Sequence, residues 1–461
     1  MKRSSSPGEL TRMNDTVNSF LFSTPAMARV FSCEAQLRAM ARFEGALTCA
    51  LEKVGVAEHG STSVLEPLLN AEFVDLVSLQ RDARDVGNIA IPFVRQLSAA
   101  VANRNEAASR AIHLGATSQD LLDTALALQM RDAGSLLDSS VEQLENALTN
   151  QVRTHAGTIL AGRTWLQPGP PTTLGLKLAG TLAALRRNRE RLHAALYQAS
   201  VLQFGGAVGT LAALGDAGKE VSAELARILN LREPELPWHT QRDRVVEVVQ
   251  VLALLTGSLA KFARDIALLM QAEVGEVSEG VSECRGGSST MPHKHNPVSC
   301  AAVLAAHARM PGLVSTMLSA MPQEHERGLG LWQAEWETVP EAFRITAAAL
   351  DYSIHIVETL QVNAVRMDVN FHDLLGVTMS EAVSAVLAPK IGRDAANALL
   401  RDASARALRE KRNLADVLKE NPQVLHHLTS ADIDRLMDPH SYLGSAQRFI
   451  KNVIGDADAR S

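Results

Sequence analysis

The residues best suited to chemistry lie in one segment, residues 286–297, which reads Gly-Gly-Ser-Ser-Thr-Met-Pro-His-Lys-His-Asn-Pro. Adjacent glycines and serines make a hinge, and the prolines prevent a helix from running through the segment. A loop that carries serine, lysine and asparagine can close over a substrate and exclude water. We therefore take Ser288, Ser289, Lys294 and Asn296 as candidate site residues.

The same segment has two other interpretations. It is also what an ordinary connection between two helices looks like. His293 and His295 could in principle bind zinc, but their spacing is odd and Lys294 stands between them, which makes that site improbable. We predict no metal site.

Long helices must position this loop. Five segments have apolar residues at helical spacing over many turns. Their predicted ranges are 120–155, 172–203, 243–282, 297–320 and 334–360. Pro311 and Pro340 lie inside the last two and can kink them. Several of these helices are apolar on more than one face, which indicates that bundles from several subunits pack together.

The composition agrees with an all-α fold. Aromatic residues make up only 4% of the 461 residues, whereas alanine and leucine are abundant, which favours closely packed helices over sheets. A chain of this length requires more than one core. We predict an N-terminal helical domain (1–112), a central long-helix bundle (113–365) and a C-terminal helical domain (366–461).

Charge and cysteine usage limit the partners and the compartment. The net charge is −6 and no long basic patch is present, so nucleic acid is not an expected partner. Residues 1–8 are polar and Ser-rich, unlike a signal peptide or membrane anchor, so no membrane association is expected. The four cysteines lack metal-binding spacing. A reduced, cytoplasmic location fits best.

Three ordered motifs resemble those of the fumarase/aspartase superfamily. The loop matches every fixed position of the signature Gly-Ser-Ser-x-Met-Pro-x-Lys-x-Asn-Pro. Residues 113–120, His-Leu-Gly-Ala-Thr-Ser-Gln-Asp, resemble the first superfamily segment, and residues 163–167, Arg-Thr-Trp-Leu-Gln, resemble the second. The resemblance covers nearly the whole chain. It implies a homotetramer with a twenty-helix core, active sites each assembled from three subunits, and no cofactor.

The resemblance also implies roles. Ser288 corresponds to the general base, whose hydroxyl needs a lowered pKa because a free serine is too weak an acid. Removal of a proton α to a carboxylate gives a doubly charged aci-carboxylate, which Lys294 and Asn296 would stabilise. His113 is a fourth candidate, for substrate binding or orientation, although a purely structural histidine is an alternative.

Further residues are expected to bind the substrate. Arg327 resembles a substrate-carboxylate arginine, and a bidentate guanidinium suits a tricarboxylate. Arg244 lies in the segment 238–244, Trp-His-Thr-Gln-Arg-Asp-Arg, which also resembles a segment of superfamily members. Arg244 and Arg242 could instead pair with carboxylates on helix faces. The predicted substrate-binding residues are Thr117, Ser118, Thr164, Gln167, Gln241, Arg244, Ser289 and Arg327.

The second motif departs from the common superfamily pattern. Fumarases and adenylosuccinate lyases have Thr-His-x-Gln, whereas this chain has Trp165 at the histidine position. A carboxylate leaving group, with a pKa of about 4, needs no general acid. The bacterial 3-carboxy-cis,cis-muconate cycloisomerase branch resembles this chain in the same Arg-Thr-Trp-Leu-Gln segment.

That branch implies reversible lactonisation of a carboxymuconate, a step of protocatechuate breakdown. The nearest alternative is an adenylosuccinate lyase-like enzyme or another lyase that releases fumarate from an N-succinyl compound. A non-catalytic structural relative is the alternative from another class, and the intact signature loop argues against it.

Overall fold

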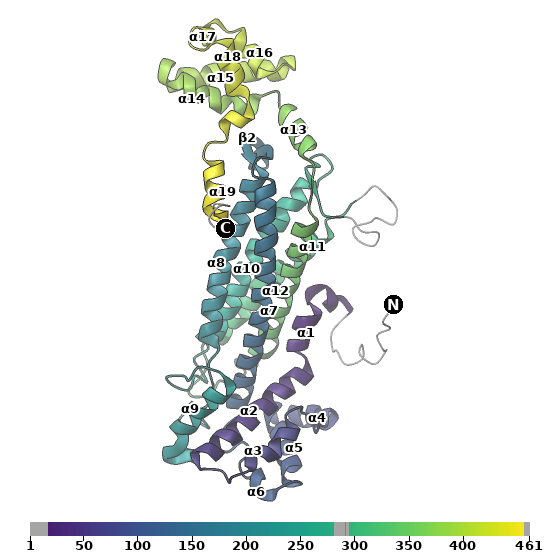
Figure 1. The fold of residues 1–461 in the computed structure, drawn as a ribbon, viewed down its shortest axis with the longest axis vertical. Helices are drawn as coiled ribbons and strands as arrows, with labels where there is room; N and C mark the ends of the chain where they lie inside the picture. The colour runs from purple at the N-terminus through teal and green to yellow at the C-terminus, as the bar shows by residue number, and fades with distance from the viewer. Residues whose placement is uncertain (1–16, 281–290, 292–294, 456–461) are drawn as a thin grey trace. The chain divides into compact units, whose positions relative to one another are not determined.

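The protein is all-α apart from two small sheets (Figure 1). The structure, a computed structural model, describes residues 17–280, 291 and 295–455. The helices before the long ones are α1 (Pro25–Val30), α2 (Cys33–Val54), α3 (Ser61–Leu65), α4 (Leu76–Val86), α5 (Ala90–Ala102) and α6 (Glu106–Ser109). The long helices are α7 (Ser118–Thr154), α8 (Leu174–Ala199), α10 (Asp243–Leu269), α11 (Val298–Ala320) and α12 (Glu335–Thr359), with the shorter α9 (Gly218–Leu229) between them. The last are α13 (Ala364–His372), α14 (Ser380–Ile391), α15 (Arg393–Glu410), α16 (Leu414–Lys419), α17 (Pro422–Leu425), α18 (Ser430–Met437) and α19 (Ala446–Ile454).

All five predicted long helices are present, and four end close to the predicted positions. The third prediction was wrong at its C-terminal end, because α10 stops at Leu269 and not at residue 282. Gly275 has a φ of 61°, a left-handed conformation that ends helices, and the Glu276 N–H closes back on the Leu269 carbonyl at 3.0 Å. The chain then forms β3 (Val277–Ser278), which pairs with β4 (Gln361–Val362).

The chain divides into two compact units. Unit 1 comprises residues 1–141, 188–257 and 305–351, and unit 2 comprises residues 142–187, 258–304 and 352–461. Each unit contains segments of all five long helices. The three-part domain division stays a prediction.

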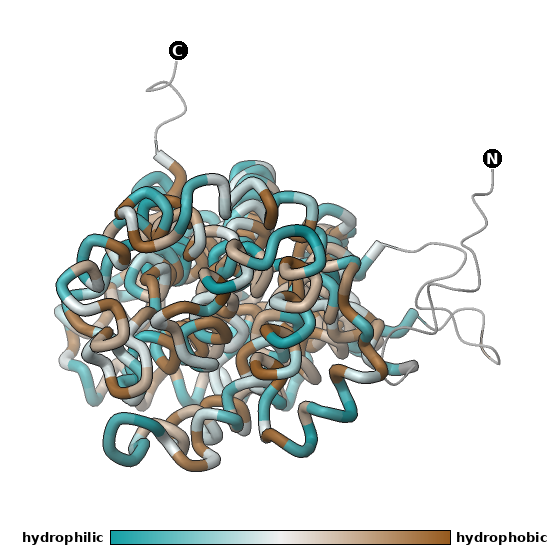
Figure 2. Tube along the Cα trace, turned by 90° about the horizontal axis from the view of Figure 1, so that it is seen from below, coloured by the Kyte–Doolittle hydropathy of each residue, from teal (hydrophilic) through white to brown (hydrophobic). Residues whose placement is uncertain are grey.

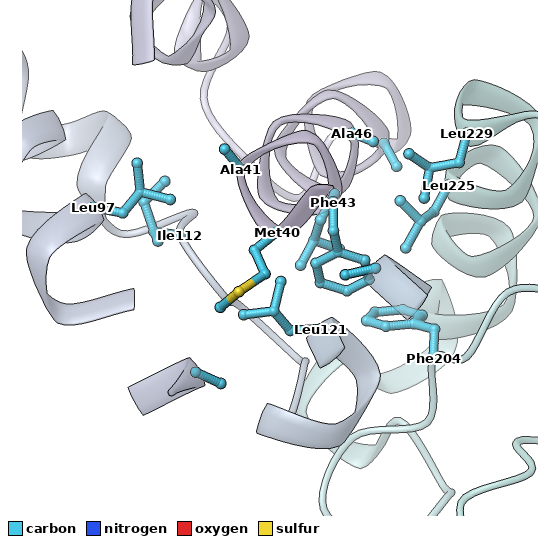
Figure 3. Close-up of a cluster of buried hydrophobic side chains, with 14 of the residues drawn as sticks. Met40, Ala41, Phe43, Ala46, Leu97, Ile112, Leu121, Phe204, Leu225 and Leu229 are labelled. Carbon is cyan, nitrogen blue, oxygen red and sulfur yellow. The ribbon is translucent and has the colours of Figure 1, made fainter. Parts of the chain in front are cut away.

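Helix α2 organises the core of unit 1. It begins after Ser32, whose hydroxyl accepts from the Ala35 N–H, and ends at Gly55 with a φ of 83°. Its apolar face packs in a cluster with side chains of α5, α7 and α9 (Figure 3). Phe43 of α2 and Phe204 are almost fully buried there. This packing fixes the start of α7, where the first motif lies.

Unit 2 contains an antiparallel hairpin of β1 (Ile159–Thr164) and β2 (Gln167–Thr173). Three prolines in β2 are tolerated because the sheet has only these two strands, so both are edges. A separate apolar cluster forms among α14, α15, α16 and α18.

Apolar residues alternate with polar ones along the helices (Figure 2). Among the described residues, α10 and α11 are long and apolar enough to cross a membrane, by length and composition only, and so is the bent pair formed by residues 364–372 and 377–391 when taken together. Protein buries 61% of the apolar stretch of α10 but only 28% of that of α11. Helix α11 therefore leaves an apolar surface uncovered in the single chain.

Candidate active site

The first motif forms a turn at the start of α7. The Thr117 N–H donates to Asp120 Oδ2 at 3.0 Å, which is one half of a capping box. The Thr117 hydroxyl is not used to cap the helix. It accepts from Arg327 Nη1 at 2.9 Å, so its own hydrogen is free to donate to another acceptor. Ser118, the next residue, is half-buried.

Asp120 holds this turn in place. Its carboxylate is fully buried and accepts five hydrogen bonds, which satisfies a group that would otherwise be costly to bury. The donors are Thr117 N and Gly206 N to Oδ2, and Gly205 N, Gln203 Nε2 and His239 Nε2 to Oδ1, at 2.7–3.1 Å. Asp120 therefore joins three segments that are far apart in the sequence.

A second buried network lies one turn further along α7. Arg242 forms two hydrogen bonds with Asp123, at 2.7 and 3.0 Å, and two with Glu335, at 2.9 and 2.6 Å. Trp332 Nε1 also donates to Asp123 at 3.0 Å. Burial opposes the charge of Arg242, but its two carboxylate partners outweigh burial and raise the pKa of the guanidinium. Burial raises the pKa of Glu335 and the charge of Asp123 adds to this effect, although the contact with Arg242 acts in the opposite direction.

Arg327 is a cation with spare donors. It is half-buried, and within the described part of the chain it makes no ion pair. Burial lowers the pKa of its guanidinium, although Asp120 and Asp123 act in the opposite direction. The Thr240 hydroxyl donates to the His325 carbonyl at 3.0 Å and so fixes the loop that carries Arg327. Arg327 and the Thr117 hydroxyl together offer donors suited to a carboxylate.

His113 lies at the start of the same motif. Its ring Nδ1 is 2.6 Å from Glu44 Oε1, and its backbone N–H donates to Glu44 Oε2 at 2.9 Å. Burial disfavours the charged ring, but Glu44 and Asp120 outweigh it, so the pKa of His113 is raised.

In the segment 238–244, the structure shows partners for Arg242 but leaves the roles of Gln241 and Arg244 untested. Arg242 pairs with carboxylates, as one interpretation of the sequence allowed. Arg244 is half-buried and makes no ion pair among the described residues, and Gln241 is exposed. Substrate binding by Gln241 and Arg244 stays a prediction.

The candidate residues Thr164 and Gln167 belong to unit 2. Thr164 and Gln167 are paired across the two-residue end of the β1–β2 hairpin. The residues between them, Trp165 and Leu166, have φ values of 54° and 63°, as a type I′ turn requires, and are 97% and 72% exposed. Bulky residues rarely adopt this conformation, so the hairpin end is strained.

The signature loop is only partly described. Ser288, Ser289, Lys294 and His293 lie outside the described residues. Asn296 is half-buried just before α11. Glu279, which precedes the loop, accepts from the Ser299 and Cys300 N–H groups at 3.0 and 2.8 Å and so caps α11. In the ranges that the structure covers, no group of three His, Cys, Asp or Glu side chains could hold a metal.

The buried carboxylates around the first motif and Arg242 were not predicted to have a role. Asp120 had a local signal, because Thr117-x-x-Asp120 has the spacing of a capping box. Glu44 had a weaker one, as a carboxylate among apolar residues of a predicted helix. Asp123 and Glu335 had none, because only the tertiary fold brings them to Arg242.

Comparison with known proteins identifies the class. The family described as Lyase matches residues 22–312, and the family described as Adenylosuccinate lyase C-terminus matches residues 376–453. The chain belongs to this lyase family, within the fumarase/aspartase superfamily, as its motifs predicted.

Within the superfamily, the chain is similar to several 3-carboxy-cis,cis-muconate cycloisomerases, and at lower identity to lyases with other names. It is 48% identical to the 3-carboxy-cis,cis-muconate cycloisomerase of Pseudomonas aeruginosa over 97% of both chains. It is 47% identical to the enzyme of that name from Pseudomonas putida, over 90% of this chain and 98% of the relative. The crystal structure of a 3-carboxy-cis,cis-muconate lactonizing enzyme from Pseudomonas putida matches with a TM-score of 0.90 and 46% identity, covering 95% and 98% of the two chains.

Proposed function

We propose that this protein is a 3-carboxy-cis,cis-muconate cycloisomerase that acts in protocatechuate breakdown. The full-length similarity to enzymes of that name carries the proposal. The pairing of Thr117 with Arg327 supports it, because a cation and a free hydroxyl hydrogen suit a substrate with several carboxylates. Trp165 also supports it, because it matches a reaction whose leaving group needs no general acid.

In the proposed reaction, one carboxylate oxygen of the substrate adds to a double bond and closes a lactone. A proton is delivered to the carbon α to another carboxylate. Ser288 exchanges this proton, and Lys294 and Asn296 stabilise the aci-carboxylate. Thr117, Ser118 and Arg327 hold the substrate carboxylates.

Turnover of 3-carboxymuconate tests the proposal, followed as loss of diene absorbance. Adenylosuccinate, assayed in parallel, is expected to give no product. Release of fumarate from adenylosuccinate without lactonisation would identify an N-succinyl lyase instead. Loss of neither substrate would favour a non-catalytic role.

Trp165→His tests the leaving-group argument. Because the carboxylate needs no general acid, this change is expected to leave the lactonisation rate unchanged or to lower it by disturbing the pocket. The measurement is kcat with 3-carboxymuconate beside the parent enzyme. A clear increase in kcat would mean that proton delivery at this position limits the reaction.

We further propose a cytoplasmic homotetramer whose active sites are shared between subunits. The uncovered apolar surface of α11 supports the assembly. So does a hollow of about 550 Å³ in unit 1, which is lined by Ala253, Pro311, Val314, Ser315, Leu318 and Ser319. The strained, exposed end of the β1–β2 hairpin is suited to enter the site of another subunit.

Light scattering or sedimentation is expected to report four subunit masses. Burial of the α11 surface stabilises the folded subunit, so stability should fall on dilution. A stable monomer at micromolar concentration would refute both the tetramer and the shared site.

A further inference from the structure

Glu44 is a buried carboxylate that the proposed chemistry has not used. It follows Phe43 on α2, which belongs to the apolar cluster of unit 1 (Figure 3), and its side chain is 0% exposed. A charge at such a place is strongly destabilising unless it is paired and hydrogen-bonded. The structure describes partners for both oxygens, and both partners belong to His113.

This contact fixes the orientation of His113. The residue has a φ of 57°, which is unfavourable for a side chain other than glycine and persists only where neighbouring groups impose it. One Glu44 oxygen holds the backbone N–H and the other holds the ring. The main chain and the imidazole are therefore oriented by the same carboxylate.

The contact also favours the charged form of the ring. The charged groups that act on His113 are Glu44 from α2 and Asp120 from α7. A carboxylate can only accept, so Nδ1 carries a hydrogen, and Nε2 has no partner among the residues that the structure describes. The side chain is 19% exposed, so it is not sealed in the core.

The turn brings His113 toward Thr117. The Ala116 N–H donates to the His113 carbonyl at 3.1 Å, so the chain folds back immediately before Thr117. Thr117 contacts Arg327. The proposed substrate has three carboxylates, and Arg327 supplies a cation for one of them.

We propose that Glu44 is a positioning residue that holds His113 as an imidazolium, with its Nε2–H donated to a second carboxylate of the substrate. This rests on the proposed function of the site. It assigns His113 to substrate binding and makes Glu44 the cause of its charge at neutral pH.

Glu44→Gln tests the proposal, because glutamine keeps the shape but removes the charge. We expect KM for 3-carboxymuconate at neutral pH to rise by about 10- to 100-fold, the effect of losing a hydrogen bond to a charged group. We expect kcat to change by much less, because the proton is exchanged elsewhere.

The pH profile separates this role from a merely structural one. Protonated His113 binds substrate better, so KM of the parent enzyme should rise as pH increases through the raised pKa of His113. In Glu44→Gln that rise should begin at lower pH, since the raising charge is gone. An identical KM profile in parent and variant would overturn the proposal.

Glu52→Gln is the matched control. Glu52 also lies on α2, accepts from backbone N–H groups of Gly60 and Thr62, and faces a histidine, with 3.1 Å to His59 Nδ1. His59 is fully exposed, so the same loss of charge should leave the KM profile unchanged.

Two measurements keep the test decisive. If Glu44→Gln does not fold, His113→Gln retains Glu44 and should show a high KM that no longer varies with pH in this range.

Titration of His113 by NMR needs no substrate. A pKa at or below the ordinary histidine value in the parent protein would refute the inference, whereas failure to turn over 3-carboxymuconate would refute only the proposed function.

Discussion

Ser288→Ala is expected to lower kcat for 3-carboxymuconate by about 10²- to 10⁴-fold, the usual contribution of a general acid–base group. Alanine leaves no group that can exchange the proton. KM should change little, because the substrate carboxylates are held by Thr117, Ser118 and Arg327. Steady-state kinetics, together with light scattering to show an intact tetramer, provide the measurement.

Ser282→Ala is the control for this change. Ser282 belongs to the same stretch of sequence but lies outside the signature, so its replacement should leave kcat unchanged. If Ser288→Ala kept activity within about tenfold of the parent, below the expected range, Ser288 would not be the proton-exchanging group. His113 would then be the first residue to examine.

Arg242→Ala is expected to lower the free energy of unfolding by about 3–5 kcal/mol, the cost of breaking a buried ion pair by removing one partner. The loss is large because Asp123 and Glu335 would both remain buried without their cation. Lysine should restore only part of the stability, since it cannot make the four hydrogen bonds of the guanidinium. Urea denaturation at fixed protein concentration measures the effect.

Arg227→Ala is the matched control for burial. Arg227 also makes two hydrogen bonds to a carboxylate, Glu224, at 2.8 and 2.6 Å, but its side chain is 65% exposed. Its removal should give no measurable change in unfolding. Equal effects of the two substitutions would show that the buried network contributes no more than a surface pair.

Periodicity was sufficient to predict the fold class and the long helices. A helix that buries apolar faces repeats every 3.6 residues, and segments such as α7 and α12 carry this repeat over many turns. The end of α10 was predicted too late, because apolar residues recur beyond Leu269, where the helix stops, and the turn that follows contains Gly275 in a left-handed conformation. Capping at such positions depends on single residues and not on a repeat.

The site was predictable only where short motifs carry it. Thr117 and Arg327 were predicted separately as carboxylate ligands, and the structure places them in contact. The carboxylates that pair with Arg242 were not predicted, because Asp123 and Glu335 meet it only through long-range folding. The roles assigned to Thr117, Arg327, Ser288 and Lys294 all stay predictions.

The charges around the first motif have a consequence for product release. Four buried carboxylates act on three basic groups: Glu44 and Asp120 on His113, Asp120 and Asp123 on Arg327, and Asp123 and Glu335 on Arg242. With His113 charged as we propose, these carboxylates outnumber these cations by one, which moderates the attraction of this group for an anion. In the proposed reaction a tricarboxylate becomes a lactone with two carboxylates, and the lost charge weakens its hold on the cations. Such a balance retains the substrate but lets the product leave, which favours turnover over tight binding.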